Sequence, residues 1–473
     1  MGGGVPHGAG DRAGYGMGTM SREYFGTDGI RGKVGEHPMT VDFALNLASA
    51  AAQVLAPEGG RVLIGKDTRL SGYLFESALE AGFVAAGVDE LLSGPLPTPA
   101  VAYLTRRFQC HFGVVISASH NPYDDNGIKF FDSSGGKLSD ELEEQIEARM
   151  QHGPITRASR SLGRATREER SRTQYQEFCA ATLPPGVNLE GLKIVIDCAN
   201  GAAYKVGPRL LADLGAEIVP VGCSPNGRNI NDGCGSTAPG LLQLTVPGVR
   251  ADLGLALDGD GDRLIMVDHL GRVVDGDQLL YVMARARARE GRLTGPVVGT
   301  VMSNFGLEQA LAAEGIEFRR APVGDRYVLA LLRETGGVLG GEASGHILCL
   351  DQTTTGDALV CALEVLAVMK RSGRALAELA AGMEKFPQVL LNVRVAQRFD
   401  PGSVAQIQDT VRSIEQRLAG AGRVVLRASG TEPVIRVMVE GRDEKATRSA
   451  AAELAEAVRA VATGSDGVGM SHA

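Results

Sequence analysis

The sequence lacks tryptophan, and aromatic residues make up 5% of its 473 positions. Its seven cysteines are scattered and form no Cys-x-x-Cys pair. Several lie in apolar runs, which is typical of reduced core residues in a cytoplasmic protein. No apolar run approaches the 18 residues that a membrane-spanning helix needs. The glycine-rich first 20 residues lack the apolar core of a signal peptide, so we expect residues 1–20 to be a disordered extension and residues 464–473 a disordered tail.

The chain also lacks a net positive charge. The formal net charge is -8, so the chain has no overall positive field that would hold nucleic acid or an anionic membrane. An anionic small substrate would need local clusters of arginine and lysine. The Walker A pattern Gly-x-x-x-x-Gly-Lys-Ser/Thr is absent, which disfavours a P-loop nucleotide enzyme.

The length and the hydrophobic periodicity indicate several α/β units. A chain of 473 residues usually folds as about three or four domains. Apolar strands, polar loops and helices alternate along it, which predicts at least partly parallel pairing. The last stretch has fewer elements. We expect an α/β protein with three related units that have mixed sheets, at residues 21–183, 184–275 and 276–386, and a smaller α+β domain at residues 387–463.

The same patterns predict individual elements. Ser139, followed by acidic residues, is expected to cap a helix. In the first unit we predict helices at residues 41–55, 71–86 and 166–182 and strands at residues 62–64, 113–116 and 128–131. In the later units we predict strands at residues 192–197, 253–257, 264–267, 297–301 and 389–395 and helices at residues 402–418 and 443–462.

A short apolar strand leads into a loop that contains Ser119. Residues 113–116 read Gly-Val-Val-Ile, and Ser-Ala-Ser-His-Asn-Pro follows at residues 117–122, where Asn-Pro favours a turn. A serine at the end of a rigid strand is a common placement for a catalytic group, although the stretch also fits an ordinary strand-to-turn junction. No Gly-x-Ser-x-Gly elbow surrounds Ser119. On extended backbone His120 would point away from it, so a hydrolase triad is not indicated.

Three carboxylates follow another apolar strand, in the segment Asp-Gly-Asp-Gly-Asp-Arg at residues 258–263. Alternate carboxylates separated by glycines can turn toward one point, where their repulsion is costly unless a hard cation is bound. Oxygen ligands favour magnesium or manganese, and three of them leave coordination positions for a phosphate oxygen. An EF-hand would need Gly and Glu where the chain has Arg263 and His269. A solvated acidic turn is the alternative.

Two further loops carry groups suited to anions and sugars. Arg-Ala-Ser-Gly-Thr at residues 427–431 combines a guanidinium, hydroxyls and a glycine that lets backbone N–H groups approach a phosphate. A plain turn between strands is the alternative. The glycine-rich loop at residues 340–346 offers a carboxylate, a hydroxyl and an imidazole, which suit the hydroxyls of a sugar ring. The candidates in these two regions are Glu342, Ser344, His346, Arg427, Ser429, Gly430, Thr431 and Arg436.

Lys129, on the strand after Ser119, is a candidate general base if the metal and other nearby cations lower its pKa. A solvent-facing strand lysine is the alternative. Arg31 and Arg69 could line an anionic cleft or simply be solvated. Together these groups predict phosphoryl transfer through a serine, in which a metal polarises the phosphoryl group and arginines hold a second phosphate.

Four motifs, in this order, resemble the α-D-phosphohexomutase superfamily. They are Ser-Ala-Ser-His-Asn-Pro, Asp-Gly-Asp-Gly-Asp-Arg, Gly-Glu-Ala-Ser-Gly-His and Arg-Ala-Ser-Gly-Thr-Glu-Pro, and the resemblance runs from Phe25 to about residue 460. It implies four domains around one central active-site cleft. It also implies that Ser119 is a phosphoserine whose phosphate is a metal ligand, and that one Mg2+ is held by Asp258, Asp260 and Asp262.

The resemblance extends to the other candidates. It implies that Lys129 is an acid/base and that His346 assists. The implied substrate-binding residues are Arg31, Arg263, Glu342, Ser344, Arg427, Ser429, Gly430, Thr431 and Arg436. The segments at residues 25–32, 116–119, 323–328 and 435–438 are similar to the branch of the superfamily that acts on glucosamine phosphates. The chain departs from that branch at Ala343, where Gln is usual, and at Ala238, where His is common.

The activity implied is interconversion of glucosamine 6-phosphate and glucosamine 1-phosphate through a 1,6-bisphosphate, for UDP-N-acetylglucosamine and cell-wall precursor synthesis. A hexose 1,6-bisphosphate or another phosphorylation would prime Ser119. A mutase acting on glucose or mannose phosphates is one alternative, and a non-catalytic sugar-phosphate-binding protein is another. The expected partner is a small sugar phosphate, with no nucleic acid and no membrane, and the chain could be a monomer or a homodimer.

Overall fold

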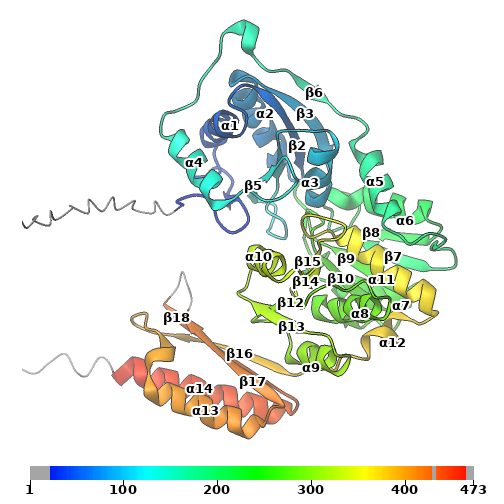
Figure 1. Ribbon diagram of the computed structural model, residues 1–473, viewed down its shortest axis with the longest axis vertical. Helices are drawn as coiled ribbons and strands as arrows, with labels where there is room; N and C mark the ends of the chain where they lie inside the picture. The colour runs from blue at the N-terminus through cyan, green and yellow to red at the C-terminus, as the bar shows by residue number, and fades with distance from the viewer. Residues whose placement is uncertain (1–21, 429–432, 465–473) are drawn as a thin grey trace, which may run out of the picture.

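The protein is built from four sheets that follow one another along the chain (Figure 1). The computed structural model describes residues 22–428 and 433–464. The predicted disordered extension and all but the first residue of the predicted tail lie outside these ranges. We call the parts of the chain that carry the four sheets units 1 to 4.

Unit 1 contains a mixed six-stranded sheet in the order β1-β5-β4-β2-β3-β6. Strands β4, β2, β3 and β6 are parallel to one another, whereas β5 and β1 run antiparallel to their neighbours. The strands are β1 (Ile30–Lys33), β2 (Gly60–Lys66), β3 (Val88–Pro95), β4 (Phe112–Ile116), β5 (Asp125–Asp132) and β6 (Ala165–Arg167). The helices are α1 (Val41–Leu55), α2 (Ser71–Ala85), α3 (Thr98–Arg107), α4 (Asp140–Met150) and α5 (Ser171–Ala181).

Units 2 and 3 also have mixed sheets with helices packed against them. Unit 2 has the order β11-β10-β9-β7-β8, and unit 3 has the order β13-β12-β14-β15. Unit 2 consists of β7 (Lys193–Asp197), α6 (Val206–Asp213), β8 (Glu217–Val221), α7 (Gly240–Gly248), β9 (Leu253–Leu257), β10 (Leu264–Asp268) and β11 (Val273–Val274). Unit 3 consists of α8 (Gly276–Arg289), β12 (Val297–Thr300), α9 (Phe305–Ala313), β13 (Phe318–Ala321), α10 (Asp325–Thr335), β14 (Leu339–Gly341), β15 (Ile347–Cys349), α11 (Ala358–Ser372) and α12 (Leu376–Ala380).

Unit 4 has a three-stranded antiparallel sheet in the order β16-β18-β17, with two helices on one side of it (Figure 1). Its elements are β16 (Gln388–Arg394), α13 (Ala405–Leu418), β17 (Gly422–Ala428), β18 (Val434–Gly441) and α14 (Glu444–Gly464). The predicted fold class, three α/β units with mixed sheets and a smaller α+β domain, is therefore confirmed.

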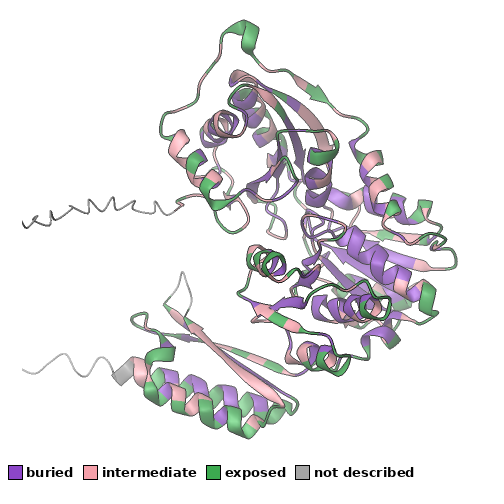
Figure 2. Ribbon diagram, viewed as in Figure 1, coloured by how far each residue is buried: buried purple, intermediate pink, exposed green. Residues whose placement is uncertain are grey.

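The apolar cores show how the units are joined. One large cluster of buried residues runs through units 1, 2 and 3 and includes Leu104, Ile196 and Leu363. Helix α11 lies inside this cluster and is buried along almost its whole length (Figure 2). Unit 4 has a core of its own, with Val437 and Leu454 among its buried residues. Units 1 to 3 therefore share one buried cluster besides smaller clusters of their own, and the core of unit 4 is separate from it.

The structure differs from the sequence-based expectation between residues 88 and 182. The predicted helix at residues 166–182 is wrong in its first part, because residues 165–167 form β6 and pair with β3. The helix begins only at Ser171. Strand β3 and helix α3 were not predicted. The cap at Ser139 is confirmed, since its hydroxyl accepts a hydrogen bond from the Leu142 N–H.

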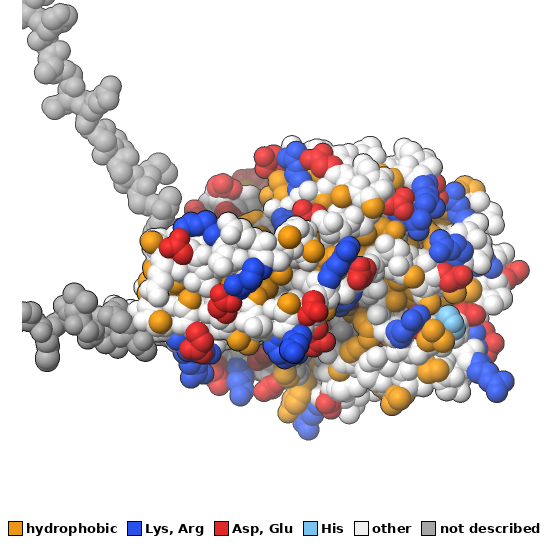
Figure 3. Space-filling model, turned by 90° about the horizontal axis from the view of Figure 1, so that it is seen from below, with side chains coloured by type: hydrophobic (Ala, Val, Ile, Leu, Met, Phe, Trp, Pro, Cys, Tyr) orange, Lys and Arg blue, Asp and Glu red, His pale blue; other side chains and the backbone are white. Residues whose placement is uncertain are grey.

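Figure 3 shows how charged side chains are distributed on one face of the molecule. Lysine and arginine side chains are interspersed there with aspartate and glutamate, and no large area has one sign of charge. Within the described ranges no helix has the length and apolar character that crossing a membrane requires.

Candidate active site

Ser119 lies buried in the loop that follows β4. The strand ends at Ile116, and the Ser119 side chain is 1% exposed. Its Oγ donates a hydrogen bond of 2.6 Å to Asp258 Oδ2, which joins the serine loop of unit 1 to the carboxylate loop of unit 2. The predicted strand placement of this serine is confirmed.

His120 does not point away from Ser119, and this prediction is wrong. It assumed extended backbone, but the φ of Ser119 is +53°. This left-handed conformation brings His120 Nδ1 to 3.4 Å from Ser119 Oγ. Burial, with the positive charges of Arg263 and Arg31, lowers the pKa of His120 to about 4. His120 is therefore a neutral imidazole beside the serine hydroxyl.

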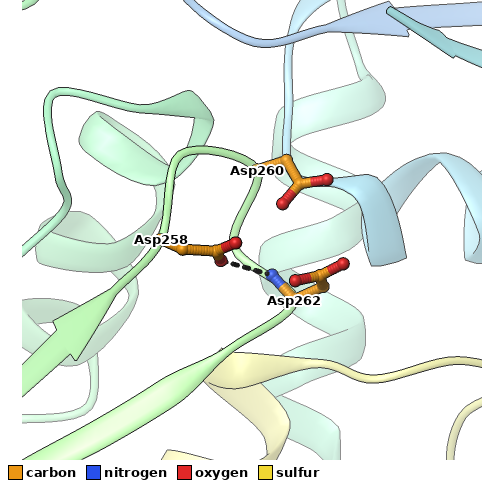
Figure 4. Close-up of side chains that lie close together, drawn as sticks. All are labelled: Asp258, Asp260 and Asp262. Carbon is orange, nitrogen blue, oxygen red and sulfur yellow. Dashed lines mark hydrogen bonds between the residues drawn. The ribbon is translucent and has the colours of Figure 1, made fainter. Parts of the chain in front are cut away.

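Asp258, Asp260 and Asp262 form a buried cluster in the loop between β9 and β10 (Figure 4). One ligand atom from each lies within 4.8 Å of the others. Gly261, with a φ of +72°, allows the chain to turn, and the Asp262 N–H donates to Asp258 Oδ1 across the turn at 3.2 Å. The three carboxylates therefore converge as the sequence predicts.

The carboxylate oxygens of this cluster fit a metal ion. Asp260 Oδ1 and Asp262 Oδ1 are buried, and neither has a hydrogen-bond partner among the described residues. Unpaired buried oxygens are costly. Burial, with the like charges of Asp262 and Asp260, also holds the pKa of Asp258 well above its usual range. A hard cation would satisfy these oxygens, which makes the cluster a candidate metal site.

Lys129, on β5, faces the carboxylates and does not point to solvent. Its Nζ lies 2.8 Å from Asp260 Oδ2, 2.8 Å from Asp28 Oδ2 and 3.7 Å from Asp262 Oδ2. Burial opposes its charge, but the three carboxylates outweigh that effect and hold its pKa above its usual range. A role for Lys129 as a base depends on a pKa lowered by the metal and other cations, and these three carboxylates act in the opposite direction. They favour the protonated form of Lys129.

A cavity of about 470 Å³ lies beside the cluster, between units 1, 2 and 3. Five of the predicted residues line it, namely Arg31, Asp262, Arg263, Glu342 and His346. His346 places Nδ1 3.8 Å from Asp262 Oδ2. Glu342 accepts a hydrogen bond of 2.9 Å from the Gly324 N–H through one carboxylate oxygen. Ser344 is close to Glu342, with 3.5 Å between the Ser344 hydroxyl and Glu342 Oε2.

Two acidic residues and one lysine that were not predicted also belong to this site. Lys137 Nζ donates to Asp28 Oδ1 and to Asp325 Oδ2, each at 2.6 Å, and so connects unit 1 to helix α10 of unit 3. Asp28 and Asp325 line the cavity. Asp28 and Asp325 lie in the segments at residues 25–32 and 323–328, whose resemblance to the glucosamine-phosphate branch was the one sequence signal for them. Nothing local marks Lys137, because its partners lie 109 and 188 residues away.

Arg427 and Arg436, the two described residues of the predicted phosphate site, lie in unit 4 and are not among the residues that line this cavity. Arg427 and Arg436 are paired across strands β17 and β18. Burial, together with the charge of Arg436, lowers the pKa of Arg427. Two arginines side by side favour an anion between them. Ser429, Gly430 and Thr431 lie outside the described residues.

Arg69 is not available to an anionic substrate. It is fully buried, and its guanidinium donates to Asp67 Oδ2 and to backbone carbonyls of the Ser119 loop. Neither of the two roles considered for it, cleft lining or solvation, describes this contact. Arg69 supports the loop.

Comparison with known proteins assigns the family. Family models described as phosphoglucomutase/phosphomannomutase alpha/beta/alpha domains I, II and III match residues 22–155, 175–271 and 275–386, and the C-terminal domain model matches residues 390–457. The phosphoglucosamine mutase of Aeromonas hydrophila is 57% identical over 93% of this chain and 99% of its own length. That of Methylococcus capsulatus is 58% identical over the same shares.

The chain belongs to the phosphoglucosamine mutase family. Phosphoglucosamine mutases are phosphohexomutases, a class of isomerases, so the chain is an enzyme of that class. The four sheets described above correspond to the four domains of the family models.

Several solved structures have the same fold as this enzyme. A phosphoglucomutase/phosphomannomutase family protein from Burkholderia thailandensis has a TM-score of 0.75 at 24% identity, over 92% of this chain and 97% of its own. The N-acetylphosphoglucosamine mutase of Aspergillus fumigatus, solved with GlcNAc-6P and magnesium, has a TM-score of 0.65 at 20% identity, over 93% of this chain and 96% of its own. At these identities the likeness concerns the fold alone.

Proposed function

We propose that this enzyme interconverts glucosamine 6-phosphate and glucosamine 1-phosphate in the cytoplasm, with Ser119 as the phosphoryl carrier. The observation that carries the proposal is the contact between the Ser119 hydroxyl and Asp258 Oδ2 at 2.6 Å, at the edge of the three-carboxylate cluster. The choice of sugar rests on the phosphoglucosamine mutases that are 57% and 58% identical to this chain.

The reaction consists of two phosphoryl transfers, one from phospho-Ser119 to the sugar and one from the sugar to Ser119. The free hydroxyl of the sugar phosphate attacks the phosphorus of phospho-Ser119, so that a sugar O–P bond forms as the Ser119 Oγ–P bond breaks. The hydroxyl proton leaves the sugar, and the departing Oγ takes up a proton. The 1,6-bisphosphate then turns over in the cavity, and its other phosphoryl group returns to Ser119. A hexose 1,6-bisphosphate can prime the free serine by the same step.

Two residues of the site have groups that suit these proton transfers. Lys129 holds its proton firmly among Asp28, Asp260 and Asp262, which suits a donor to the departing oxygen better than a base. The neutral imidazole of His120 lies 3.4 Å from Ser119 Oγ, which suits it to accept the serine proton when the second phosphoryl group is transferred to Ser119.

The cluster Asp258, Asp260 and Asp262, together with the Ser119 phosphate, would hold one Mg2+. A bound magnesium ion neutralises charge on a phosphoryl group during transfer. The substrate-binding residues divide between two places in the fold. Arg31, Arg263, Glu342, Ser344 and His346 lie at or beside the cavity. Unit 4 would hold the distal phosphate through Arg427, Ser429, Gly430, Thr431 and Arg436.

The test is kcat/KM for glucosamine, glucose and mannose 6-phosphates, measured with the same enzyme and with Ser119→Ala as the control. We expect glucosamine 6-phosphate to be preferred. A preference for mannose or glucose 6-phosphate by tenfold or more, about 1.4 kcal/mol, would assign the enzyme to the alternative mutase. A Ser119→Ala variant with wild-type turnover would refute the carrier role instead.

A further inference from the structure

We infer that Asn231 of unit 2 is a positioning residue that, with Arg69, holds Ser119 in its reactive conformation against the carboxylate loop. The inference rests on the proposed role of Ser119 as phosphoryl carrier. Asn231 lies in the loop between β8 and α7 and touches neither the cavity nor the three aspartates in any contact described above. Its side chain acts on the backbone of the serine loop.

Two side chains from different units donate to the same two carbonyls of the serine loop. Asn231 Nδ2 donates to Ser119 O at 2.9 Å and to Asn121 O at 3.0 Å. Arg69 NH2 donates to Ser119 O at 3.1 Å and to Asn121 O at 2.9 Å. Arg69 comes from unit 1, as Ser119 does, whereas Asn231 comes from unit 2. The two carbonyl oxygens therefore accept hydrogen bonds from both unit 1 and unit 2.

These hydrogen bonds are needed because the backbone of Ser119 is strained. A non-glycine residue at a φ of +53° lies in a region that costs roughly 1–2 kcal/mol for L-residues. It persists where surrounding contacts determine it from several sides. Ser117 contributes one such contact, since its Oγ accepts a hydrogen bond of 3.0 Å from the Ser119 N–H. Asn231 and Arg69 fix the other end of the same residue.

Asn231 is itself anchored beside the carboxylate loop. Its N–H donates to Ala199 O at 2.9 Å. Gly259, between the first two aspartates, packs so closely that an added Cβ would lie 2.6 Å from Ser119 O and 2.9 Å from Asn231 Nδ2. The serine loop, the carboxylate loop and the Asn231 amide therefore meet at one point. A shift of this amide changes where Ser119 Oγ lies relative to Asp258.

Satisfying the two carbonyls does not by itself account for Asn231. Arg69 already donates to both, so each would keep a partner if the amide were removed. A buried carbonyl with one good donor carries little penalty. Loss of the Asn231 amide should therefore disturb the geometry of the serine loop more than the stability of the fold.

The test compares Asn231→Gly, Asn231→Asp and the control Asn229→Ala. Asn231 has a φ of +58°, so glycine keeps this backbone without strain while removing the amide. Aspartate keeps the shape and replaces the donor with an acceptor. The control residue lies in the same loop, where its Nδ2 donates to Ser224 O and its Oδ1 accepts from the Asn226 N–H.

For both Asn231 variants we expect kcat to fall about 10- to 100-fold, the scale of a small misplacement of reacting groups, with KM changed less than about twofold. The initial rate of Ser119 phosphorylation by glucose 1,6-bisphosphate should fall by the same factor. Asn231→Gly should keep the wild-type Tm to within about 2 °C. Asn229→Ala should retain wild-type kcat.

Wild-type kcat in Asn231→Gly and Asn231→Asp would overturn the inference. So would a loss of kcat in Asn231→Gly that disappears when its rate is corrected for the fraction of unfolded enzyme. Ser119→Ala, assayed in parallel, distinguishes failure of the positioning role of Asn231 from failure of the carrier role of Ser119. If that variant is inactive while both Asn231 variants are wild-type, the positioning role fails alone, and if it turns over normally the carrier role and the positioning role fail together.

Discussion

Replacing Glu90 with glutamine should make the enzyme more stable, increasingly so as the pH rises. Glu90 lies on β3 and is 0% exposed, and neither of its carboxylate oxygens has a hydrogen-bond partner among the described residues. Burial, with the negative charges of Glu80 and Glu76, raises its pKa to about 9. Folding at neutral pH therefore requires this carboxyl group to take up a proton.

The sign and size follow from proton linkage. The folded pKa lies above the unfolded one, near 4.5, so the folded state binds more protons at any pH between the two values. The stabilisation that Glu90 contributes is complete below about pH 4.5 and is lost as the pH rises toward 9. The slope in that window is up to about 1.4 kcal/mol per pH unit. Glutamine has nearly the same shape and does not ionise, so this slope disappears in the variant.

The assay is Tm against pH for the wild type, Glu90→Gln and Glu58→Gln, an exposed glutamate of the same unit. Between about pH 6 and 8 the advantage of Glu90→Gln should grow by roughly 2 to 3 kcal/mol. This difference in free energy corresponds to a shift of several degrees in the Tm of the part of the chain that contains unit 1. The curve of Tm against pH for the control, Glu58→Gln, should run parallel to that of the wild type. Parallel curves for Glu90→Gln as well would refute the reasoning, because they would mean that Glu90 is not forced to be neutral.

Two further predictions concern the metal and the distal phosphate. Asp260→Asn removes one of the three carboxylates and should weaken magnesium binding at least about tenfold, which the rise in Tm on adding Mg2+ measures; an unchanged rise would contradict the metal assignment. Arg427→Ala should lower kcat/KM for glucosamine 6-phosphate by about 10- to 100-fold, the scale of a charged hydrogen bond. The exposed Arg412→Ala on α13 serves as its control, and equal kcat/KM values for the two variants would remove Arg427 from the substrate site.

The parts of the site that were predicted from the sequence are formed by residues that are adjacent in the chain. The alternation of aspartate and glycine at residues 258–262 restricts the ways in which those carboxylates can turn, and the structure confirms that they converge. Likewise the apolar run at residues 113–116 forms β4 and ends just before the Ser119 loop. In both cases a buried strand and the loop after it lie next to each other in the chain, so the chemistry and its scaffold share one local signal.

The parts that were missed depend on contacts between distant segments. The prediction for His120 failed because it assumed extended backbone, whereas tertiary contacts hold Ser119 at a positive φ. The contact between Lys129 and Asp28 was not predicted, because the two residues are 101 positions apart in the sequence (129 - 28). Asn231 donates to carbonyls 110 and 112 residues away. No local pattern in the sequence specifies such pairs.

The most direct test of the account is the phosphorylation of Ser119 itself. The enzyme is incubated with glucose 1,6-bisphosphate and Mg2+, and the mass of the intact protein and of its peptides is measured before and after glucosamine 6-phosphate is added. The account predicts one phosphoryl group, located on Ser119, which is lost to the sugar on addition of substrate and is absent from Ser119→Ala. Turnover of glucosamine 6-phosphate with Ser119 never phosphorylated, or with the phosphoryl group on another residue, would contradict it.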